Sequence, residues 1–592
     1  MRKRPASGTP HRQQAARSGF PLLLAAVVGT GILLSLTALP GRHPSPDNSG
    51  GRQEAERGSG LRTPESAPRS GAPLSRVSPG RTRTDRIVVR LRSPQPLEQL
   101  ESRISQAAGF AGLRIEPHFR QSPTDLERAR QEGEARTGRP LPDLNRYRRI
   151  ELPAGTSADE ANRLLEDLRR LDFVESAFVE PVAEPAALED LDPDTPRGAG
   201  TETGLTPDYR PLQLYLRDAP VGLGATDVAR YPGARGARVR LIDIEGDWNW
   251  AHEDLPAPFF QYGSPLDGWQ NHGTAVLGEL VGSSNGKGVE GIVPDLEVGA
   301  VSFSDLGVAA AIDLASSVLE EGDIILIELH APGPNAPHGG GQFGYVPMEY
   351  WQDVFDAIRV ATANGRIVVE AAGNGQQDLD DPVYGGLFDR QIRDSGAVLV
   401  AAGTPLGLTA EWFTNYGSRI DLHGWGTSIA TTGYGTLHGG DQNRWYTSGF
   451  GGTSGASPMV CGAIASLQGM ARASFGVGLD RDLAVELLRS TGSAFTGTKA
   501  IGPRPNLVAA RDALIRGAAE LHGVIRDAGS GAPLPDLPVL IDGDRWVCTD
   551  SPRLLPTLRC FPGSARKPPG SGTNRRCTRS IPAAGSVAST CR

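Results

Sequence analysis

The chain has 592 residues, of which 39% are hydrophobic and 22% are charged, and its formal net charge is −8. This length exceeds that of one domain and predicts roughly three or four, while the composition is typical of a globular protein. The small net negative charge excludes a protein that binds nucleic acid through a basic surface. Five cysteines in a chain of this size exclude a disulfide scaffold.

The N-terminus carries a basic segment followed by an apolar one. Residues 1–19 contain no acidic side chain, and residues 20–39, FPLLLAAVVGTGILLSLTAL, are apolar or small. A basic flank before such a run indicates an export signal, and the run is also close to the length that spans a bilayer. The pattern favours a signal peptide over residues 1–39 that is cleaved, with membrane anchoring by residues 20–39 as the alternative. Both predict a protein that is secreted or held in the cell envelope.

A linker and a small domain are predicted next. Residues 40–84 are rich in Pro, Gly, Ser and Arg and too poor in apolar side chains to form a core. Residues 85–182 contain strand-like and helical patterns, with Ser157 and Glu160 spaced as a capping box, so we expect a small α+β domain. Residues 183–208 are acidic and without apolar periodicity, which predicts an exposed linker that can be cleaved.

The pattern over residues 209–516 is that of one larger α/β domain. Strand-like apolar runs alternate with helical ones, which favours a parallel sheet with helices on both faces. In such sheets chemistry gathers at the carboxyl ends of the strands. The predicted strands are residues 238–244, 296–302, 323–329, 366–372 and 397–403, and the predicted helices are residues 272–282, 306–322 and 349–365.

Four polar residues lie at the ends of these predicted elements. They are Asp243 after RLI, His272 in NHGT, Asn374 in VEAAGN and Ser454 in GGTSGASP. A nucleophilic serine needs a base, a carboxylate that orients the base, and donors for the oxyanion. Each residue alone has an ordinary structural explanation as a cap, a turn or a close-packed small residue. Together they supply each role once, and the order Asp, His, Ser is that of subtilisin.

These four motifs in one order resemble the subtilase family of serine proteases. Residues 238–294 and 366–467 carry the resemblance. It implies a subtilisin-like fold and an endopeptidase that cleaves protein or peptide substrates through an acyl-enzyme, with no cofactor required for the chemistry. It assigns the roles of nucleophile, base, holder of the base and oxyanion donor to Ser454, His272, Asp243 and Asn374, respectively.

The resemblance also implies how the protease is made. Subtilases commonly carry a small propeptide that assists folding and then blocks the cleft, and residues 85–182 resemble such a unit. The protein is then expected to be a zymogen whose own propeptide is a binding partner until the linker over 183–208 is cut. The segment 327–347 is expected to line the cleft.

The chain also departs from the family pattern. It has Asp243-Ile-Glu245 where the family usually has Asp-Thr/Ser-Gly, and two extra residues separate Asp243 from His252. Alternation along a strand places Glu245 on the same side as Asp243. Glu245 then raises the pKa of the base, binds a substrate amine, or turns away. Gly455 and Met459 replace a usual Met and a usual His in the serine motif.

A calcium site is a further expectation from the resemblance. Many subtilases bind Ca²⁺ through the aspartate of the His-x-Asp-Leu turn, which is Asp254 here, and through the loop after the histidine helix. Asn285 in SSNGKG and Gln213 near the start of the catalytic domain are the other candidate ligands. Calcium takes six to eight oxygen ligands, although this loop is also an ordinary turn sequence.

The C-terminal region carries a weaker pattern. Residues 517–550 resemble the first strands of a carboxypeptidase-regulatory-like β-sandwich, and residues 551–592 form a basic tail without an acidic residue. We expect either a shifted reading frame or a disordered tail there, because too few strands remain for a sandwich. Cys461 lies in an apolar run and is expected to be a small buried residue.

Three other functions are alternatives to the protease. A catalytically inactive homologue that acts as an envelope binding or adhesion protein is supported by the unusual Glu245. A hydrolase of another fold is disfavoured because no G-x-S-x-G surrounds Ser454. A metalloprotease is disfavoured because HEDL at 252 is not H-E-x-x-H.

Overall fold

The computed structural model describes residues 76–108, 113–188, 204–337 and 340–517, together with six strands between 519 and 591. The predicted export segment and most of the predicted linker over 40–84 lie outside the described residues. Within the described part of the chain, no helix has the length and apolar character needed to span a bilayer.

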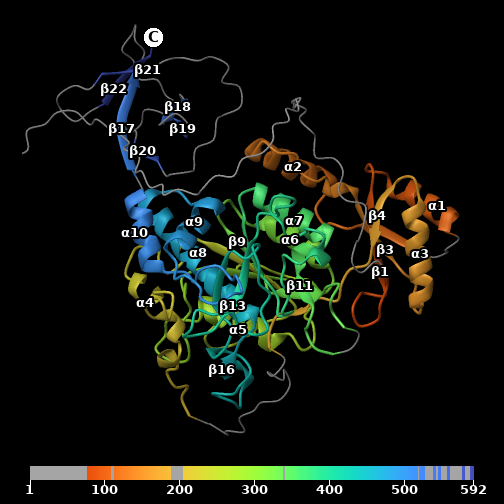
Figure 1. The fold of residues 1–592 in the computed structure, drawn as a ribbon, viewed down its shortest axis with the longest axis horizontal. Coiled ribbons are helices and arrows are strands. Elements are labelled where there is room, and N and C mark those ends of the chain that lie inside the picture. The colour runs from red at the N-terminus through yellow and green to blue at the C-terminus, as the bar shows by residue number, and fades with distance from the viewer. Residues whose placement is uncertain are drawn as a thin grey trace, which may run out of the picture. The chain divides into compact units, whose positions relative to one another are not determined.

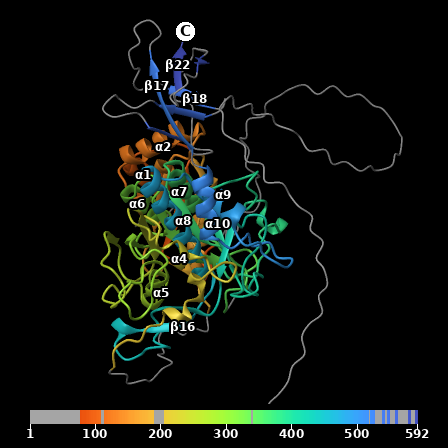
Figure 2. The same ribbon diagram turned by 90° about the vertical axis from the view of Figure 1, so that its left-hand side faces the viewer.

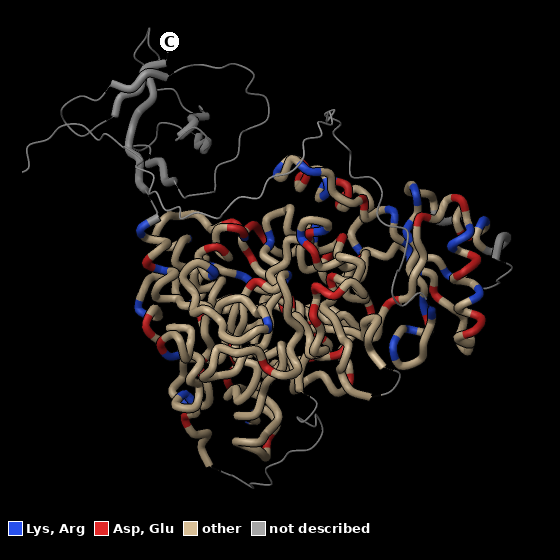
Figure 3. Tube along the Cα trace, viewed as in Figure 1, with Lys and Arg blue, Asp and Glu red and all other residues tan. Residues whose placement is uncertain are grey.

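The N-terminal domain is a four-stranded antiparallel sheet with helices (Figure 1). The strand order is β2-β3-β1-β4, and the predicted capping box joins Ser157 and Glu160 at the start of α3. Charged residues are dense on its helices, as Figure 3 shows. The elements are β1 (Arg86–Leu91), α1 (Leu97–Ala108), β2 (Arg114–Pro117), α2 (Pro123–Thr137), β3 (Tyr147–Glu151), α3 (Ala158–Arg170) and β4 (Val174–Phe178).

Strand β1 serves two cores because its side chains alternate. Ile87 and Val89 face α1 and α3 in the core of the N-terminal domain itself, as expected for a period of two. Val88 belongs instead to a core shared with helices α6 (Val308–Val318) and α7 (Gln352–Ala363) of the large domain. The second face of this small sheet is therefore covered by the large domain.

Polar contacts join the same two surfaces. The hydroxyl of Tyr147 donates to Asp356 Oδ2 at 2.6 Å, and His118 Nε2 lies 3.0 Å from Asp353 Oδ2. Gln121 donates to Asp313 Oδ1 at 2.8 Å. These partners lie on α6 and α7, so the N-terminal domain binds the large domain through buried polar as well as apolar contacts.

The large domain is built on a seven-stranded sheet in which every pairing is parallel. Its order is β14-β13-β12-β9-β6-β8-β7. All of these strands except the exposed edge strand β7 are largely buried, as expected for a sheet that is covered on both faces. The predicted parallel α/β fold is confirmed. The strands are β6 (Arg240–Glu245), β7 (Gln261–Tyr262), β8 (Glu297–Ser302), β9 (Ile324–Ile327), β12 (Ile367–Ala371), β13 (Val398–Gly403) and β14 (Leu422–Trp425).

Helices cover both faces of this sheet (Figure 1 and Figure 2). Helices α5 (Gln270–Val281), α8 (Thr453–Phe475), α9 (Arg481–Thr491) and α10 (Leu507–Gly517) contribute to one core, and α6 and α7 to the other. Successive residues of β9 alternate between them: Ile324 belongs to the first core and Ile325 to the second. The continuous apolar run of β9 is explained by this burial on both sides.

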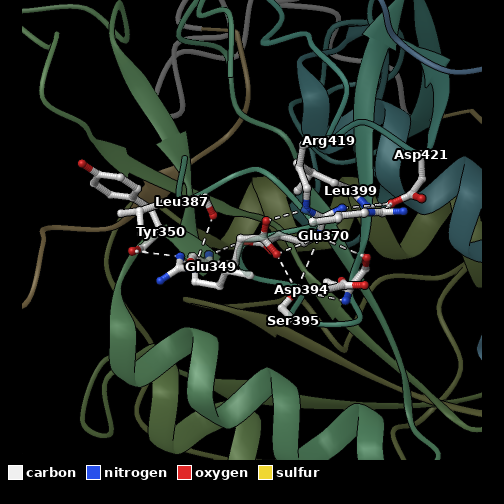
Figure 4. A network of polar contacts seen from close by, with 12 residues as sticks. Glu349, Tyr350, Glu370, Leu387, Asp394, Ser395, Leu399, Arg419 and Asp421 are labelled. Carbon is white, nitrogen blue, oxygen red and sulfur yellow. Dashed lines mark hydrogen bonds and ion pairs between the residues drawn. The ribbon is translucent and has the colours of Figure 1, made fainter. Parts of the chain in front are cut away.

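A buried network of ion pairs and hydrogen bonds lies beside strand β12 of the sheet (Figure 4). The guanidinium of Arg419 donates to both oxygens of Glu349 at 2.7 Å and to Asp421 Oδ2 at 3.1 Å. Glu370 on β12 accepts the backbone N–H of Glu349 at 2.8 Å, and burial, followed by the charge of Glu349, raises its pKa to about 8. The network anchors the strand that leads to Asn374.

The remaining strands are short. β10 (Leu329–Pro332) pairs antiparallel with β11 (Tyr345–Pro347) and with β5 (Glu184–Pro185), and β15 (Ile429–Thr432) pairs with β16 (Tyr446–Phe450). Strands also occur beyond 550, in the region expected to be a tail. The C-terminal strands are β17 (Ala519–Arg526), β18 (Pro538–Ile541), β19 (Arg545–Cys548), β20 (Thr557–Cys560), β21 (Cys577–Ser580) and β22 (Val587–Cys591).

Candidate active site

The predicted catalytic residues gather at the carboxyl edge of the parallel sheet. Strand β6 ends at Glu245, and β12 ends three residues before Asn374. Helix α5, which carries His272, and helix α8, which carries Ser454 in its first turn, pack against each other on one face of the sheet. An edge where several strands end is where α/β sheets place their ligands.

His272 is held by Glu245 and not by Asp243. The Nδ1 atom of His272 lies 2.7 Å from Oε2 of Glu245, and both side chains are buried. Asp243 instead accepts a hydrogen bond from the indole Nε1 of Trp248 at 2.8 Å. The expectation that Asp243 holds His272 is thus corrected by the structure.

The position of the strand end explains this difference. Asp243 and Glu245 share one side of β6, but Glu245 is the last residue of the strand and is about 7 Å further along it. The sequence held a signal for this: two residues too many separate Asp243 from His252, and counting from Glu245 removes that surplus.

Burial sets the protonation of the pair. Desolvation raises the pKa of Glu245 well above its usual value and lowers the pKa of His272 to about 4. The pKa of Asp243 is raised by burial and by the nearby charge of Glu245. His272 is therefore neutral near pH 7 in the intact chain. In the tautomer that donates from Nδ1 to Glu245, its Nε2 is left as an acceptor.

Asn374 and the start of α8 are fixed to each other. The side-chain Oδ1 of Asn374 accepts the backbone N–H of Thr453 at 2.9 Å and its hydroxyl at 3.0 Å. These bonds orient the amide so that Nδ2 donates to the carbonyl of Ala187 at 2.9 Å. The backbone N–H of Ser454 donates to the carbonyl of Ala186 at 3.1 Å. Two donors beside the serine are thus aimed at adjacent carbonyls of one segment.

That segment lies in the site like an extra strand. Pro185 and Glu184 pair antiparallel with Leu329 and His330 of β10, and the backbone N–H of Ala186 donates to the carbonyl of Glu328 at 3.3 Å. The predicted cleft segment over 327–347 thus contributes β10 and β11 to this pairing.

The segment also closes the site. Ala186 is fully buried and Ala187 is 7% exposed, while Ser454 beneath them is 0% exposed. The linker predicted to be exposed over 183–208 is therefore buried at its N-terminal end. Access to the serine requires that this segment leave.

Two further carboxyl groups lie below the serine. The hydroxyl of Ser457 donates to Glu328 at 2.8 Å, and Glu279 on α5 is buried without a hydrogen-bond partner among the described residues. Burial raises the pKa of both, and each of them is close enough to another carboxylate to raise it further. Sequence reasoning missed this pair, although each glutamate interrupts an otherwise apolar run, in AVLGELVG and IILIEL.

The residues expected to bind calcium do not fit a cation. Asp254 is surrounded by donors: it accepts from Asn285 Nδ2 at 2.7 Å, from the backbone N–H of Val289 at 2.9 Å and from the hydroxyl of Tyr446 at 2.9 Å. Gln213 turns to the backbone of Glu290, from which its Oε1 accepts at 2.9 Å. A cation needs free oxygens that converge, whereas these oxygens already accept N–H and O–H groups.

Comparison with known proteins agrees with the motifs. The model of the subtilase family, Peptidase_S8, matches residues 245–489. An intracellular serine protease of Paenibacillus polymyxa is 27% identical over 267 residues, which are 42% of this chain and 70% of that protein. An extracellular protease of Xanthomonas campestris pv. campestris is 31% identical over 262 residues, which are 43% of this chain and 40% of that protein.

A solved structure is also similar. Fervidolysin from Fervidobacterium pennivorans, described as a keratinolytic enzyme related to subtilisin, is 17% identical with a TM-score of 0.47, covering 80% of this chain and 68% of that one. The matched family and the relatives define the class as serine endopeptidases, which act on proteins or peptides. Residues 245–489 thus match the subtilase family, and the relatives support a subtilisin-like serine protease, as the sequence motifs predicted.

Proposed function

We propose that the protein is a serine endopeptidase made as a zymogen, in which Ser454 is the nucleophile, His272 the base and Glu245 the residue that orients the base. The observation that carries this assignment is the 2.7 Å contact between His272 Nδ1 and Glu245 Oε2. A base whose Nδ1 is held in this way presents Nε2 for the proton of the serine.

The chemistry follows from the orientation of these groups. Ser454 Oγ attacks the carbonyl carbon of a bound peptide while Nε2 of His272 takes the hydroxyl proton, and that proton then passes to the leaving amine. The oxyanion is stabilised by the N–H of Ser454 and by Nδ2 of Asn374, both already fixed by the start of α8. Water attacks the resulting ester and regenerates the serine.

Asp243 has a different place in this proposal. It accepts the indole N–H of Trp248, and the Trp248 ring lies where a side chain on Gly273, next to His272, would stand. Asp243 therefore supports the packing beside the base. The charge of Asp243 also raises the pKa of His272, but this effect is smaller than the lowering of that pKa by burial.

The zymogen state is supported by the buried segment over 184–187. It pairs with β10 and covers Ser454 completely. An intact chain is therefore expected to be inactive toward other substrates. The N-terminal pattern of residues 1–39 supports export of this zymogen to the cell envelope or the medium.

The inactive homologue is the alternative, and the site argues against it. Serine, histidine, a carboxylate on the histidine and two oxyanion donors are all present. The test compares processed wild-type enzyme with Ser454→Ala protein that an added protease, removed afterwards, has cut in the linker over 183–208. Both are assayed for peptide hydrolysis and for labelling by serine-directed phosphonates. We expect hydrolysis and labelling to be lost in the Ser454→Ala protein, with kcat falling by roughly 10⁶, the value known for subtilisin. Hydrolysis by Ser454→Ala at the wild-type rate would overturn the role of Ser454. No hydrolysis by the processed wild-type enzyme would leave the adhesion or binding function in place.

A further inference from the structure

The segment that covers Ser454 is placed as a substrate would be. Ala186 is the last residue that pairs with the strand region, through its N–H to Glu328. Its carbonyl accepts the N–H of Ser454 at 3.1 Å. The chain bends at Ala186, and Ala187 forms an isolated bridge with Gly452. Gly452 has φ of +97°, and a Cβ there would lie 2.2 Å from the Ala186 carbonyl oxygen.

Side chains of the cleft also contact the two residues before Ala186. The hydroxyl of Tyr345 donates to Glu184 Oε1 at 2.7 Å. Gln342 donates to the carbonyl of Pro185 at 3.1 Å and accepts from Asn374 Nδ2 at 3.0 Å. Gln342 therefore connects the docked strand to the oxyanion donor, while Tyr345 contacts a carboxylate.

We infer that the protease cleaves its own chain at the Ala186–Ala187 bond. We also infer that Tyr345 gives it a preference for substrates with an acidic residue at a defined position, two residues before the residue whose carbonyl is attacked. This inference rests on the proposed function and adds the bond and the substrate class to it. The preferred substrate is a peptide of the form Glu-Pro-Ala, cut after Ala.

The step conserves atoms and protons. Ser454 Oγ forms a bond to the carbonyl carbon of Ala186 and its proton moves to His272. The oxyanion on Ala186 accepts the N–H of Ser454, and Nδ2 of Asn374 turns to it from the Ala187 carbonyl, to which it donates in the intact chain. The bond from the carbonyl carbon to the nitrogen of Ala187 breaks as that nitrogen takes the proton. Water then hydrolyses the ester, which leaves a carboxylate on Ala186 and a free amine on Ala187.

The preference for an acidic residue has a physical basis in burial. Tyr345 is only 7% exposed and Glu184 is half-buried, so the hydrogen bond from the Tyr345 hydroxyl to Glu184 is partly shielded from competing water. Hydrogen bonds to charged groups contribute about 1.5–3 kcal/mol, which corresponds to a preference of about tenfold or more over a neutral side chain. The backbone pairing with β10 does not depend on the side chain and gives no such preference.

The first measurement identifies the bond. Intact-mass analysis of purified wild-type protein is expected to show one fragment that ends at Ala186 and one that begins at Ala187. The Ser454→Ala protein is expected to stay uncut. A cut at Ala187–Leu188 or elsewhere would overturn the assignment of the bond.

The second measurement tests the preference with two peptides on processed enzyme, one containing Glu-Pro-Ala-Ala and the other Gln-Pro-Ala-Ala. We expect kcat/KM to be about tenfold higher for the Glu peptide, and Tyr345→Phe to bring the ratio close to one. Tyr350→Phe is the matched control, because the Tyr350 hydroxyl is buried without a partner among the described residues, and it should keep the wild-type ratio.

The outcomes separate the two proposals. Cleavage of both peptides at equal rates would overturn the acidic preference while leaving the protease function intact. Cleavage of neither peptide, together with no phosphonate labelling, would overturn the protease function itself.

Discussion

The imidazole of His272 is bound by Glu245, 2.7 Å away, although Asp243 lies two residues earlier on the same side of the same strand. One carboxylate oxygen of Asp243 accepts a hydrogen bond from Trp248, and the other oxygen has no hydrogen-bond partner among the described residues. One strand therefore carries two buried carboxyl groups with separate partners. This arrangement makes the two residues distinguishable by mutation.

We expect Glu245→Gln to lower kcat by roughly 10⁴, as loss of the corresponding carboxylate does in subtilisin. Asp243→Asn is expected to cost about tenfold, because it weakens one hydrogen bond from Trp248. Compared with Glu245→Gln, Glu245→Asp should recover part of the activity and the wild-type pH profile, because it restores a carboxylate. Such a recovery would not be expected if Glu245 were needed only for folding. The opposite ranking of Glu245→Gln and Asp243→Asn would return the orienting role to Asp243.

The pH profile offers an independent test of His272. Burial lowers the pKa of this imidazole to about 4, so the base stays unprotonated as the pH falls below 6.5, and protonation removes it only at lower pH. In the intact Ser454→Ala protein, in which this burial is present, we expect an NMR titration of His272 to have its midpoint below 6.5. The midpoint would lie above 6.5 if a charged partner, and not burial, dominated the site.

The sequence predicted the sheet and the positions of four site residues for a simple physical reason. Apolar strands alternating with helices define a parallel sheet, and polar residues at strand ends must then meet at one edge. The choice between Asp243 and Glu245 was not accessible in this way. Both residues alternate to the same side, and the choice depends on where β6 ends, which is at Glu245.

The covering segment was missed for another reason. Its acidic neighbours indicated exposure, whereas Ala186 is held by backbone hydrogen bonds to Glu328 and Ser454. Backbone pairing of this kind leaves no mark on composition. The small size of Ala186 and Ala187, which lets the chain lie close to Gly452, is the one feature of the sequence that agrees with it.

The N-terminal domain should control the activity of the intact chain. His118→Ala removes the buried contact with Asp353 and is expected to weaken the docking of this domain, because it leaves the Asp353 carboxylate without that partner. Fresh His118→Ala zymogen should therefore convert to active enzyme faster than wild type in a time course of peptide hydrolysis. The control is Arg103→Ala, because Arg103 lies on the exposed side of the small domain; this variant should convert at the wild-type rate. His252→Ala is not suitable as a control, because His252 lies within the catalytic domain and its ring forms a hydrogen bond with the carbonyl of Trp445.

The network around Arg419 predicts a large effect on stability (Figure 4). Arg419→Met leaves Glu349 buried without its cation, whereas Asp421 keeps Arg390. Breaking a buried pair in this way costs about 3–5 kcal/mol. The control is Arg240→Met, which removes an exposed pair with Glu297 and should cost less than about 1 kcal/mol. Denaturant unfolding of both variants in the Ser454→Ala background, which cannot digest itself, measures the difference. Equal losses would show that the buried network contributes nothing beyond a surface pair.

Calcium is expected to leave the stability unchanged. A bound ion stabilises the folded state by mass action, but Asp254 already accepts hydrogen bonds from Asn285, Val289 and Tyr446. A Cβ at Gly288 would lie 2.0 Å from Asp254 Oδ2, which shows how closely the loop encloses this carboxylate. Thermal unfolding of Ser454→Ala protein should give the same Tm in millimolar Ca²⁺ and in chelator. Asp254→Asn should lower the free energy of unfolding by about 1–3 kcal/mol in both conditions, because the three donors lose their charged acceptor. A higher Tm with Ca²⁺, lost in Asp254→Asn and accompanied by stoichiometric calcium in elemental analysis, would show that the loop rearranges to hold the ion.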